Sequence, residues 1–164
     1  MPELIIGIDN GLDGGLCAIS TFDGAIIAKT RMPTLQMLKK KEVDIRRVNY
    51  WIQELHTSFE LAIEEPLAHA KSSQAVRSMA ISFGKLLGMA ESHHYDVKRV
   101  SVHKWQKHLL GRVPKGKTKE FALELAEQLA PDENWLASER CRKPHDGMID
   151  AYLIATHIWS GKKS

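Results

Sequence analysis

The segment LIIGIDNG, residues 4–11, opens the chain with a short β-branched run that ends in a carboxylate. Such a run predicts a buried strand over residues 4–9, and Asn10-Gly11 predicts a tight turn after it. Two further strand candidates follow at residues 16–21 and 25–30, joined by a turn at Phe22-Asp23-Gly24. We therefore expect three strands connected by hairpins at the start of the fold.

The rest of the chain alternates between helical and extended patterns. A polar, lysine-rich link is expected around residues 39–41. Apolar alternation predicts strands over residues 60–64 and 96–102, the first of which is ended by Pro66. Apolar residues at helical spacing and helix-ending prolines predict helices over residues 43–56, 73–93, 103–110, 118–130 and 145–160. This order predicts an α/β fold with a central mixed five-stranded sheet flanked by helices, the first three strands being antiparallel.

Composition narrows the class of protein. A chain of 164 residues is expected to form a single domain over residues 1–164, and 43% hydrophobic with 26% charged residues argues against disorder. Cys17 and Cys141 cannot build a disulfide framework or a CxxC zinc site. No apolar run approaches the length needed to cross a membrane, and the first residues lack the order of a secretion signal. We expect neither a membrane protein nor a secreted one.

Charge is unevenly distributed along the chain. Residues 98–119 hold eight Lys or Arg and no Asp or Glu, whereas the remaining chain holds 15 basic and 20 acidic residues. A basic strip on an otherwise acidic protein is typical of nucleic-acid binding, although a solvated basic face would have the same composition.

Four acidic residues occupy positions that are expected to be wholly or partly buried. Asp9 and Glu64 end predicted strands, and Asp146 and Asp150 lie four residues apart on one face of an apolar helix. Mg²⁺ prefers oxygen ligands, and two such ions about 4 Å apart can hydrolyse a phosphodiester. Individually, Asp9 could cap its turn, Glu64 could be solvated and Asp146 could favour a helix N-terminus; Asp150 is hardest to explain without partners.

A stripe of small residues recurs every four positions on the predicted helix over residues 73–93. Its members are Ala80, Gly84 and Gly88. Small side chains allow close approach by another helix or strand, either of the same chain or of a dimer partner.

Three runs together resemble the RuvC-type Holliday junction resolvases of the RNase H-like superfamily, in the branch with phage and organellar members. They are IIGIDNGLDGGLCAIS, LAIEEP with the following HAKSSQAVRSMAISFGKLLGM, and KPHDGMIDAYLIATH. Their order and spacing match over nearly the whole chain. The resemblance implies an RNase H-like fold in which Asp9, Glu64, Asp146 and Asp150 are the catalytic, metal-binding tetrad for two Mg²⁺ ions, with Mn²⁺ able to substitute.

The same resemblance implies a function. It is that of a Mg²⁺-dependent crossover junction endodeoxyribonuclease of DNA recombination and repair, a homodimer that holds a four-way junction and nicks two opposed strands symmetrically. Such a protein would act in the cytoplasm of a bacterial or phage-infected cell, or in an organelle after removal of a transit peptide.

The resemblance also marks residues that would contact DNA. The loop and helix start after Glu64 supply Lys71, Ser72, Ser73 and Gln74, and the motif KGKTKEFALELAEQLAP supplies Lys115, Lys117 and Lys119. His145, beside Asp146, is a possible auxiliary group that would polarise water or contact the scissile phosphate.

The sequence departs from the family at three points. Asn10 stands where proline is usual, the last two acids are four residues apart where bacterial members typically have three, and Leu67 stands where those members place an aromatic wedge. We therefore assign no wedge. Two alternatives to a resolvase remain: a nuclease of this fold acting on other branched DNA or on RNA/DNA hybrids, and a non-catalytic junction-binding module. The presence of all four acids argues against the latter.

Overall fold

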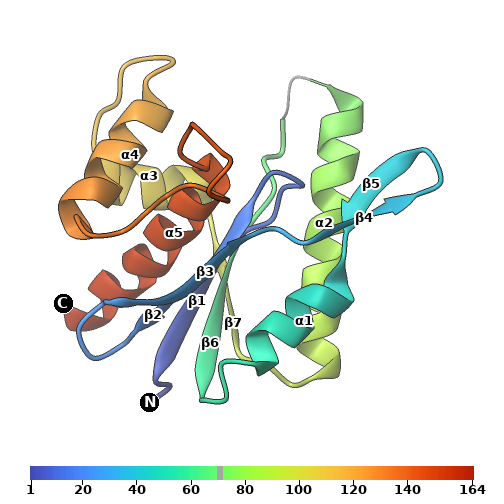
Figure 1. The fold of residues 1–164 in the computed structure, drawn as a ribbon, viewed down its shortest axis with the longest axis horizontal. Helices are drawn as coiled ribbons and strands as arrows, with labels where there is room; N and C mark the ends of the chain where they lie inside the picture. Colours follow the sequence, from blue (N-terminus) through green and yellow to red (C-terminus); the bar gives the residue numbers. More distant parts are fainter. Residues whose placement is uncertain (70–71) are drawn as a thin grey trace.

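The computed structural model describes residues 1–69 and 72–164 and contains a five-stranded sheet in the order β3-β2-β1-β6-β7, with helices on both sides (Figure 1). In chain order the elements are β1 (Leu4–Asp9), β2 (Gly15–Ser20), β3 (Ile26–Arg31), β4 (Thr34–Met37), β5 (Lys40–Val43), α1 (Ile45–Gln53), β6 (Phe59–Glu64), α2 (Ser73–Ser92), β7 (Val97–Val100), α3 (Val102–Leu110), α4 (Thr118–Leu129) and α5 (Asp146–Lys163).

Strand pairing confirms the predicted mixed sheet. β1 and β3 both pair antiparallel with β2, while β1, β6 and β7 run parallel. Parallel strands need a crossover connection, and the segments carrying α1 and α2 provide these crossovers for β6 and β7. Because β1 and β6 are parallel neighbours, their carboxyl ends lie at the same edge of the sheet.

The central strand β1 separates two hydrophobic cores. Its side chains alternate, so that Ile5 packs with α3, α4 and α5, whereas Ile6 and Ile8 pack with α1 and α2 on the other face. All three isoleucines are fully buried, so the apolar run forms the buried strand that the sequence predicts.

Helix α5 approaches the sheet unusually closely. A Cβ added at Gly7 would lie 2.0 Å from the carbonyl oxygen of Ala151, which shows that α5 lies directly against β1 at this position. Gly7 is therefore required by packing, since any side chain would displace the helix.

The lysine-rich segment around residues 39–41 is not a simple link, and the sequence-based expectation was wrong there. Residues 34–43 form an antiparallel two-stranded sheet, β4-β5, separate from the main one (Figure 1). Three consecutive lysines have low strand propensity, so local pattern gave no sign of this hairpin. Its base is fixed by a tertiary contact: Lys85 of α2 donates to Glu42 Oε2 at 2.8 Å and to the Val43 carbonyl at 3.1 Å.

The remaining elements follow the predictions with shifted ends. α1 begins at Ile45, because Val43 belongs to β5, and α5 continues to Lys163. Among the described residues, no helix has the length and apolar character that crossing a membrane requires.

Candidate functional site

Two acidic side chains end neighbouring strands at one edge of the sheet. Ile8 of β1 pairs with Ile63 of β6, so Asp9 and Glu64, the next residue of each strand, emerge side by side. The side-chain amide of Asn10, which is 3% exposed, donates a hydrogen bond to the Glu64 backbone carbonyl. Asn10 therefore joins the two strand ends, a contact that proline could not make at this position.

The N-terminus of α5 brings the other two acids to the same edge. The turn between β1 and β2 contacts the first turn of α5, where Gly14 and Gly147 form an isolated bridge. A Cβ on Gly147 would lie 2.3 Å from the Asp13 carbonyl oxygen, so the contact requires glycine. This contact places Asp146 and Asp150 within electrostatic range of Asp9, and Asp150 within range of Glu64 as well.

Burial and mutual repulsion raise the pKa of three of these carboxyls. Burial is the main cause in each case: the pKa of Asp9 rises to about 6, and those of Glu64 and Asp150 rise to about 8. The charges of neighbouring acids add to the effect, and the backbone N–H of Gly11, which donates to Asp9 Oδ1 at 3.2 Å, opposes it. Ionisation of all these acids would concentrate negative charge where water does not fully screen it.

Trp105 orients one of the carboxylates. Its indole N–H donates to Glu64 Oε2 at 2.6 Å, and the ring of Trp105, on α3, is fully buried. This hydrogen bond favours the ionised form of Glu64 and limits the rise of its pKa.

Lys119 forms an ion pair with one of the acids. Its ammonium group lies 2.7 Å from Asp146 Oδ2, and the contact raises the pKa of Lys119. The lysine side chain is 80% exposed and that of Asp146 is 48% exposed, so this ion pair lies at the mouth of the site and is readily rearranged.

The donor set fits a divalent cation. Four carboxylates from three elements offer hard oxygen ligands, and burial and mutual repulsion, which raise the pKa of three of them, would both be offset by a bound cation. Among the described residues, however, no three His, Cys, Asp or Glu side chains stand in positions that would already hold one metal ion. Adjustment of side-chain rotamers, of which the partly exposed Asp146 is the freest, would be part of metal binding.

His145 caps α5. Its Nδ1 accepts a hydrogen bond from the Met148 backbone N–H at 3.2 Å, so the neutral ring carries its proton on Nε2. Partial burial lowers its pKa, which favours the neutral ring. The auxiliary chemical role predicted for His145 stays a prediction beside this structural one.

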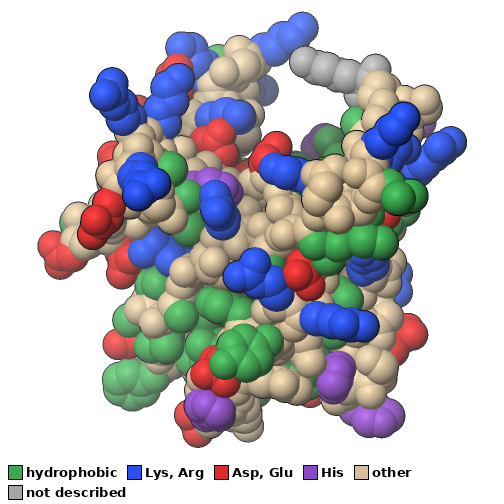
Figure 2. All heavy atoms as spheres, turned by 45° about the vertical axis from the view of Figure 1, so that its right-hand side comes forward, with side chains coloured by type: hydrophobic (Ala, Val, Ile, Leu, Met, Phe, Trp, Pro, Cys, Tyr) green, Lys and Arg blue, Asp and Glu red, His purple; other side chains and the backbone are tan. Residues whose placement is uncertain are grey.

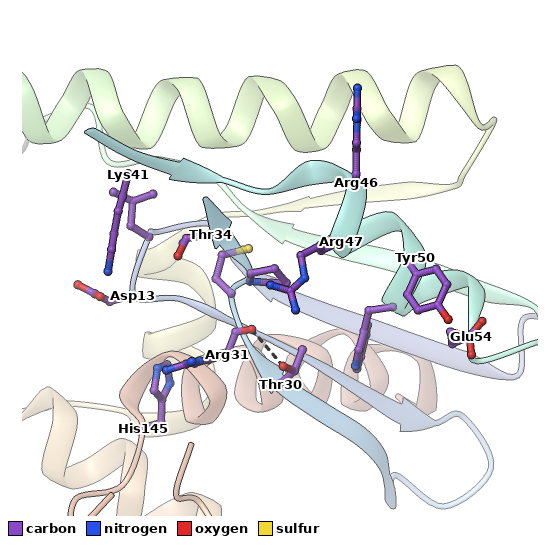
Figure 3. A pocket seen from close by; sticks show the side chains of 14 residues that line it. Asp13, Thr30, Arg31, Thr34, Lys41, Arg46, Arg47, Tyr50, Glu54 and His145 are labelled. Carbon is purple, nitrogen blue, oxygen red and sulfur yellow. Dashed lines mark hydrogen bonds between the residues drawn. The ribbon is translucent and has the colours of Figure 1, made fainter. Parts of the chain in front are cut away.

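An open cleft of about 800 Å³ begins beside the acids. Asp13, Lys41 and His145 lie at one end of the cleft, Arg31 and Arg47 line its middle, and Tyr50 and Glu54 lie at the other end (Figure 3). The cleft extends between the end of β3, the β4-β5 hairpin and α1, and its lining includes four Lys or Arg side chains against two acids.

The residues predicted to contact DNA occupy two regions. Ser72 caps α2, its Oγ accepting from the Ala75 N–H at 3.1 Å, and exposed Ser73 and Gln74 begin that helix, whereas Lys71 lies outside the described residues. On the other side, Lys115 is exposed before α4, and Lys117 pairs with Glu120 at 3.1 Å. Lys119 differs from the others because it lies at the acids themselves.

Sequence reasoning missed three residues of this site. Trp105 has no local signal, because it is simply one apolar position of a short helix. Asn10 was recognised only as a departure from the family. Asp13, which lies in the GLDGG run and adds to the charge felt by Asp9, could have been found as a fifth acid beside the first strand.

Comparison with known proteins supports the fold. No protein-family model matches the sequence, and no curated protein matches it. Among solved structures, RuvC of T. thermophilus in complex with a Holliday junction substrate is similar at a TM-score of 0.63 and 16% identity, over 98% of this chain and 96% of that chain. A Thermus thermophilus RuvC structure is similar at a TM-score of 0.61 and 17% identity, over 98% and 96% of the two chains. The chain has the RuvC-type, RNase H-like fold, as predicted.

Proposed function

We propose that this protein is a divalent-metal-dependent endonuclease that resolves four-way DNA junctions. The observation that carries the proposal is the convergence of the partly buried Asp9, Glu64 and Asp150, with Asp146 at the rim, from three separate elements. Partly buried carboxylates that repel one another destabilise a fold unless a cation binds them, and this fold is shared with a protein solved on a Holliday junction substrate.

The four acids would hold the metal, with Mg²⁺ as the expected ion and Mn²⁺ as a substitute. Bound divalent ions, two in the mechanism we favour, would supply an activated water and stabilise the leaving oxygen of the phosphodiester. The protein's own residues position the ligands: Trp105 holds Glu64 Oε2, and the cap formed by His145 fixes the start of α5. Lys119, exposed and already beside Asp146, can turn to the scissile phosphate.

Substrate contacts would extend from the acids on both sides. Lys and Arg side chains are frequent over the upper half of the face in Figure 2, the end of the molecule at which β1 and β6 end. We propose that Lys115, Lys117 and Lys119 contact phosphates on one side, and Lys71, Ser72, Ser73 and Gln74 on the other.

A junction with two opposed scissile strands calls for two active sites, so we propose a homodimer. The exposed face of α2 is the candidate interface, because Ile81 is 46% exposed there. At Gly84 and Gly88, no atom of the described chain would lie within 4 Å of an added Cβ. The small-residue stripe is therefore available to a second copy.

Cleavage of a synthetic four-way junction tests the function. With Mg²⁺, we expect paired, symmetric nicks on the junction and none on matched linear duplex, and loss of cutting with EDTA. Asp150→Asn should bind the junction and fail to cleave, with cleavage reduced by a factor of about 10³ or more. Asp132→Asn, at an exposed acid after α4, is the matched control and should cleave normally.

The other outcomes separate the alternatives. If the protein cuts an RNA/DNA hybrid and not the junction, it is a nuclease of this fold that acts on hybrids. Tight junction binding without cutting under any metal would make it a binding module. Full activity of Asp150→Asn would contradict the proposed metal site.

A further inference from the structure

The turn of the β4-β5 hairpin exposes apolar side chains to solvent. Leu38 is 100% exposed and Met37 is 48% exposed. Leu38 also has a φ of 52°, in the left-handed region that glycine or asparagine occupies far more easily than leucine. Its side chain contributes no burial to the fold, so neither turn geometry nor core packing explains why leucine occupies this position.

Basic residues follow this apolar tip directly. Lys39, Lys40 and Lys41 come next in the sequence, and all three are exposed. Over residues 31–47 the chain holds six Lys or Arg against two acids, a basic segment distinct from the one at residues 98–119. One of these two acids, Glu42, is engaged by Lys85, which further reduces negative charge near the tip.

The hairpin stands on a firm base. The Asp44 N–H donates to the Pro33 carbonyl at 2.9 Å, which closes the two strands, and the bonds of Lys85 to Glu42 and Val43 attach the second strand to α2. The tip therefore projects from an element that is attached to the rest of the fold. A side chain that inserts between stacked bases needs such a rigid support.

Hollows with basic lining residues lie on both flanks of the hairpin, and one of them reaches residues beside the acids. Lys41 lines the end of the cleft that also holds Asp13 and His145, and Arg31 and Arg47 lie farther along it (Figure 3). Lys41 also borders a second hollow of about 280 Å³ against α2, together with Arg77 and the Gln74 already assigned to DNA contact. A polyanion lying along the cleft would reach Asp13 and His145, beside the acidic site.

We propose that the β4-β5 hairpin is a DNA wedge: Leu38 and Met37 insert against an unstacked base step at the junction while Lys39, Lys40 and Lys41 bind the flanking phosphates. The proposal rests on the proposed function and adds to it the element that opens the bases. Apolar side chains inserted between base steps, with basic residues beside them, are a general means of distorting duplex DNA. Two apolar side chains form too small a patch for a stable protein interface.

Base opening can be measured separately from cleavage. The inactive Asp150→Asn protein is bound to a four-way junction carrying 2-aminopurine beside the branch point, whose fluorescence rises when the base unstacks. We expect a rise on binding, and loss of most of that rise when Leu38→Ser is added, with nearly unchanged junction affinity. Phe22→Ser, an equally exposed apolar residue (89%) on the turn between β2 and β3, is the matched control and should keep the full rise.

A second variant tests the phosphate contacts. Replacing Lys39, Lys40 and Lys41 together with alanine should weaken junction binding and reduce the slope of log affinity against log salt by about 2–3, roughly one for each lost phosphate contact. Lys163→Ala, at the C-terminus, is the control and should leave the slope unchanged. Thermal unfolding of each variant should match that of its parent, because all these side chains are exposed.

Several outcomes would overturn the wedge. An unchanged fluorescence rise in Leu38→Ser, or its loss in Leu67→Ser alone, would exclude the hairpin tip. Binding to vesicles of anionic phospholipid that Leu38→Ser abolishes, with junction fluorescence unaffected, would make the tip a membrane contact. If Asp150→Asn fails to prefer the junction over linear duplex, the proposed function fails and the wedge with it, whereas selective junction binding with an unaltered hairpin response rejects the wedge alone.

Discussion

At the scale of single residues, the acidic site combines charge with burial. Asp9, Glu64 and Asp150 have raised pKa values chiefly because burial disfavours their ionised forms, and their mutual repulsion adds to this. Only Trp105 and a backbone N–H donate hydrogen bonds to them among the described residues. Without a bound cation, a site of this kind lowers the free energy of unfolding, and this loss of stability can be measured.

We predict that without divalent metal the free energy of unfolding falls as the pH rises from about 4 to about 8. An acid whose pKa is raised by folding binds its proton more tightly in the folded state. Its stabilising effect is therefore complete below its unfolded pKa, near 4, and is lost as the pH passes the folded pKa values of about 6 and about 8. The slope is at most about 1.4 kcal/mol per pH unit for each group.

Urea unfolding at pH 6 and pH 8.5 in EDTA measures this loss. Asp150→Asn should flatten the pH dependence, and Mg²⁺ should stabilise the wild type at pH 8.5 more than it stabilises the variant. Asp132→Asn should behave as the wild type does. A wild-type stability that is constant from pH 6 to pH 8.5 in EDTA would show that the carboxyls are not held as described.

At the scale of elements, the relation of α5 to β1 sets the geometry of the site. Helix α5 carries Asp146 and Asp150, and its distance from the strand that carries Asp9 depends on the absence of side chains at Gly7 and Gly147. Strands and helices were predictable here because apolar spacing is local. The distance between two elements was not, since it depends on which glycine faces which backbone.

We predict that Gly7→Ala destabilises the fold by about 3 kcal/mol or more, because its Cβ would overlap the Ala151 carbonyl oxygen and push α5 away. Any folded fraction should bind Mg²⁺ more weakly. Gly161→Ala is the matched control: in the exposed last turns of α5, where an added Cβ meets no neighbouring atom, alanine should leave the stability unchanged or raise it by up to about 1 kcal/mol. Urea denaturation compares the two, and equal effects would contradict the close packing of α5.

At the scale of the whole molecule, the two sides of the sheet have different roles. The side with α3, α4 and α5 builds the acidic site and supplies Lys119 to it. The side with α1 and α2 carries the hairpin and an exposed helix face. In a homodimer through α2, that face would be buried and the two acidic sites would belong to one assembly.

We predict that the chain is a dimer in solution and that Ile81→Asp makes it monomeric, since a charge would be buried in the interface. Sedimentation equilibrium at micromolar concentration checks the mass. The variant should still nick junctions but should lose the coupled second nick on the opposed strand. Leu129→Asp, at an equally exposed leucine (49%) of α4, should remain dimeric. A dimeric Ile81→Asp would move the interface elsewhere, and a monomeric wild type would reject the homodimer.

The amino-acid sequence alone was enough to predict three features: the three antiparallel strands at the start of the fold, the mixed five-stranded sheet, and the four acids at strand ends and on one helix face. These features follow from hydrophobic period, turn residues and carboxylates in apolar surroundings, all of which are local. The resemblance of its motifs added the RNase H-like fold, which the comparison of structures confirms.

Only the tertiary structure decided the contacts between residues far apart in the chain. The bond from Trp105 to Glu64 spans 41 residues and that from Asn10 to Glu64 spans 54. The β4-β5 hairpin is likewise attached to α2 by Lys85, some 43 residues from Glu42. Local spacing carries no information about such pairs, because they form only when independently folded segments pack together, and burial then sets their pKa values and exposure.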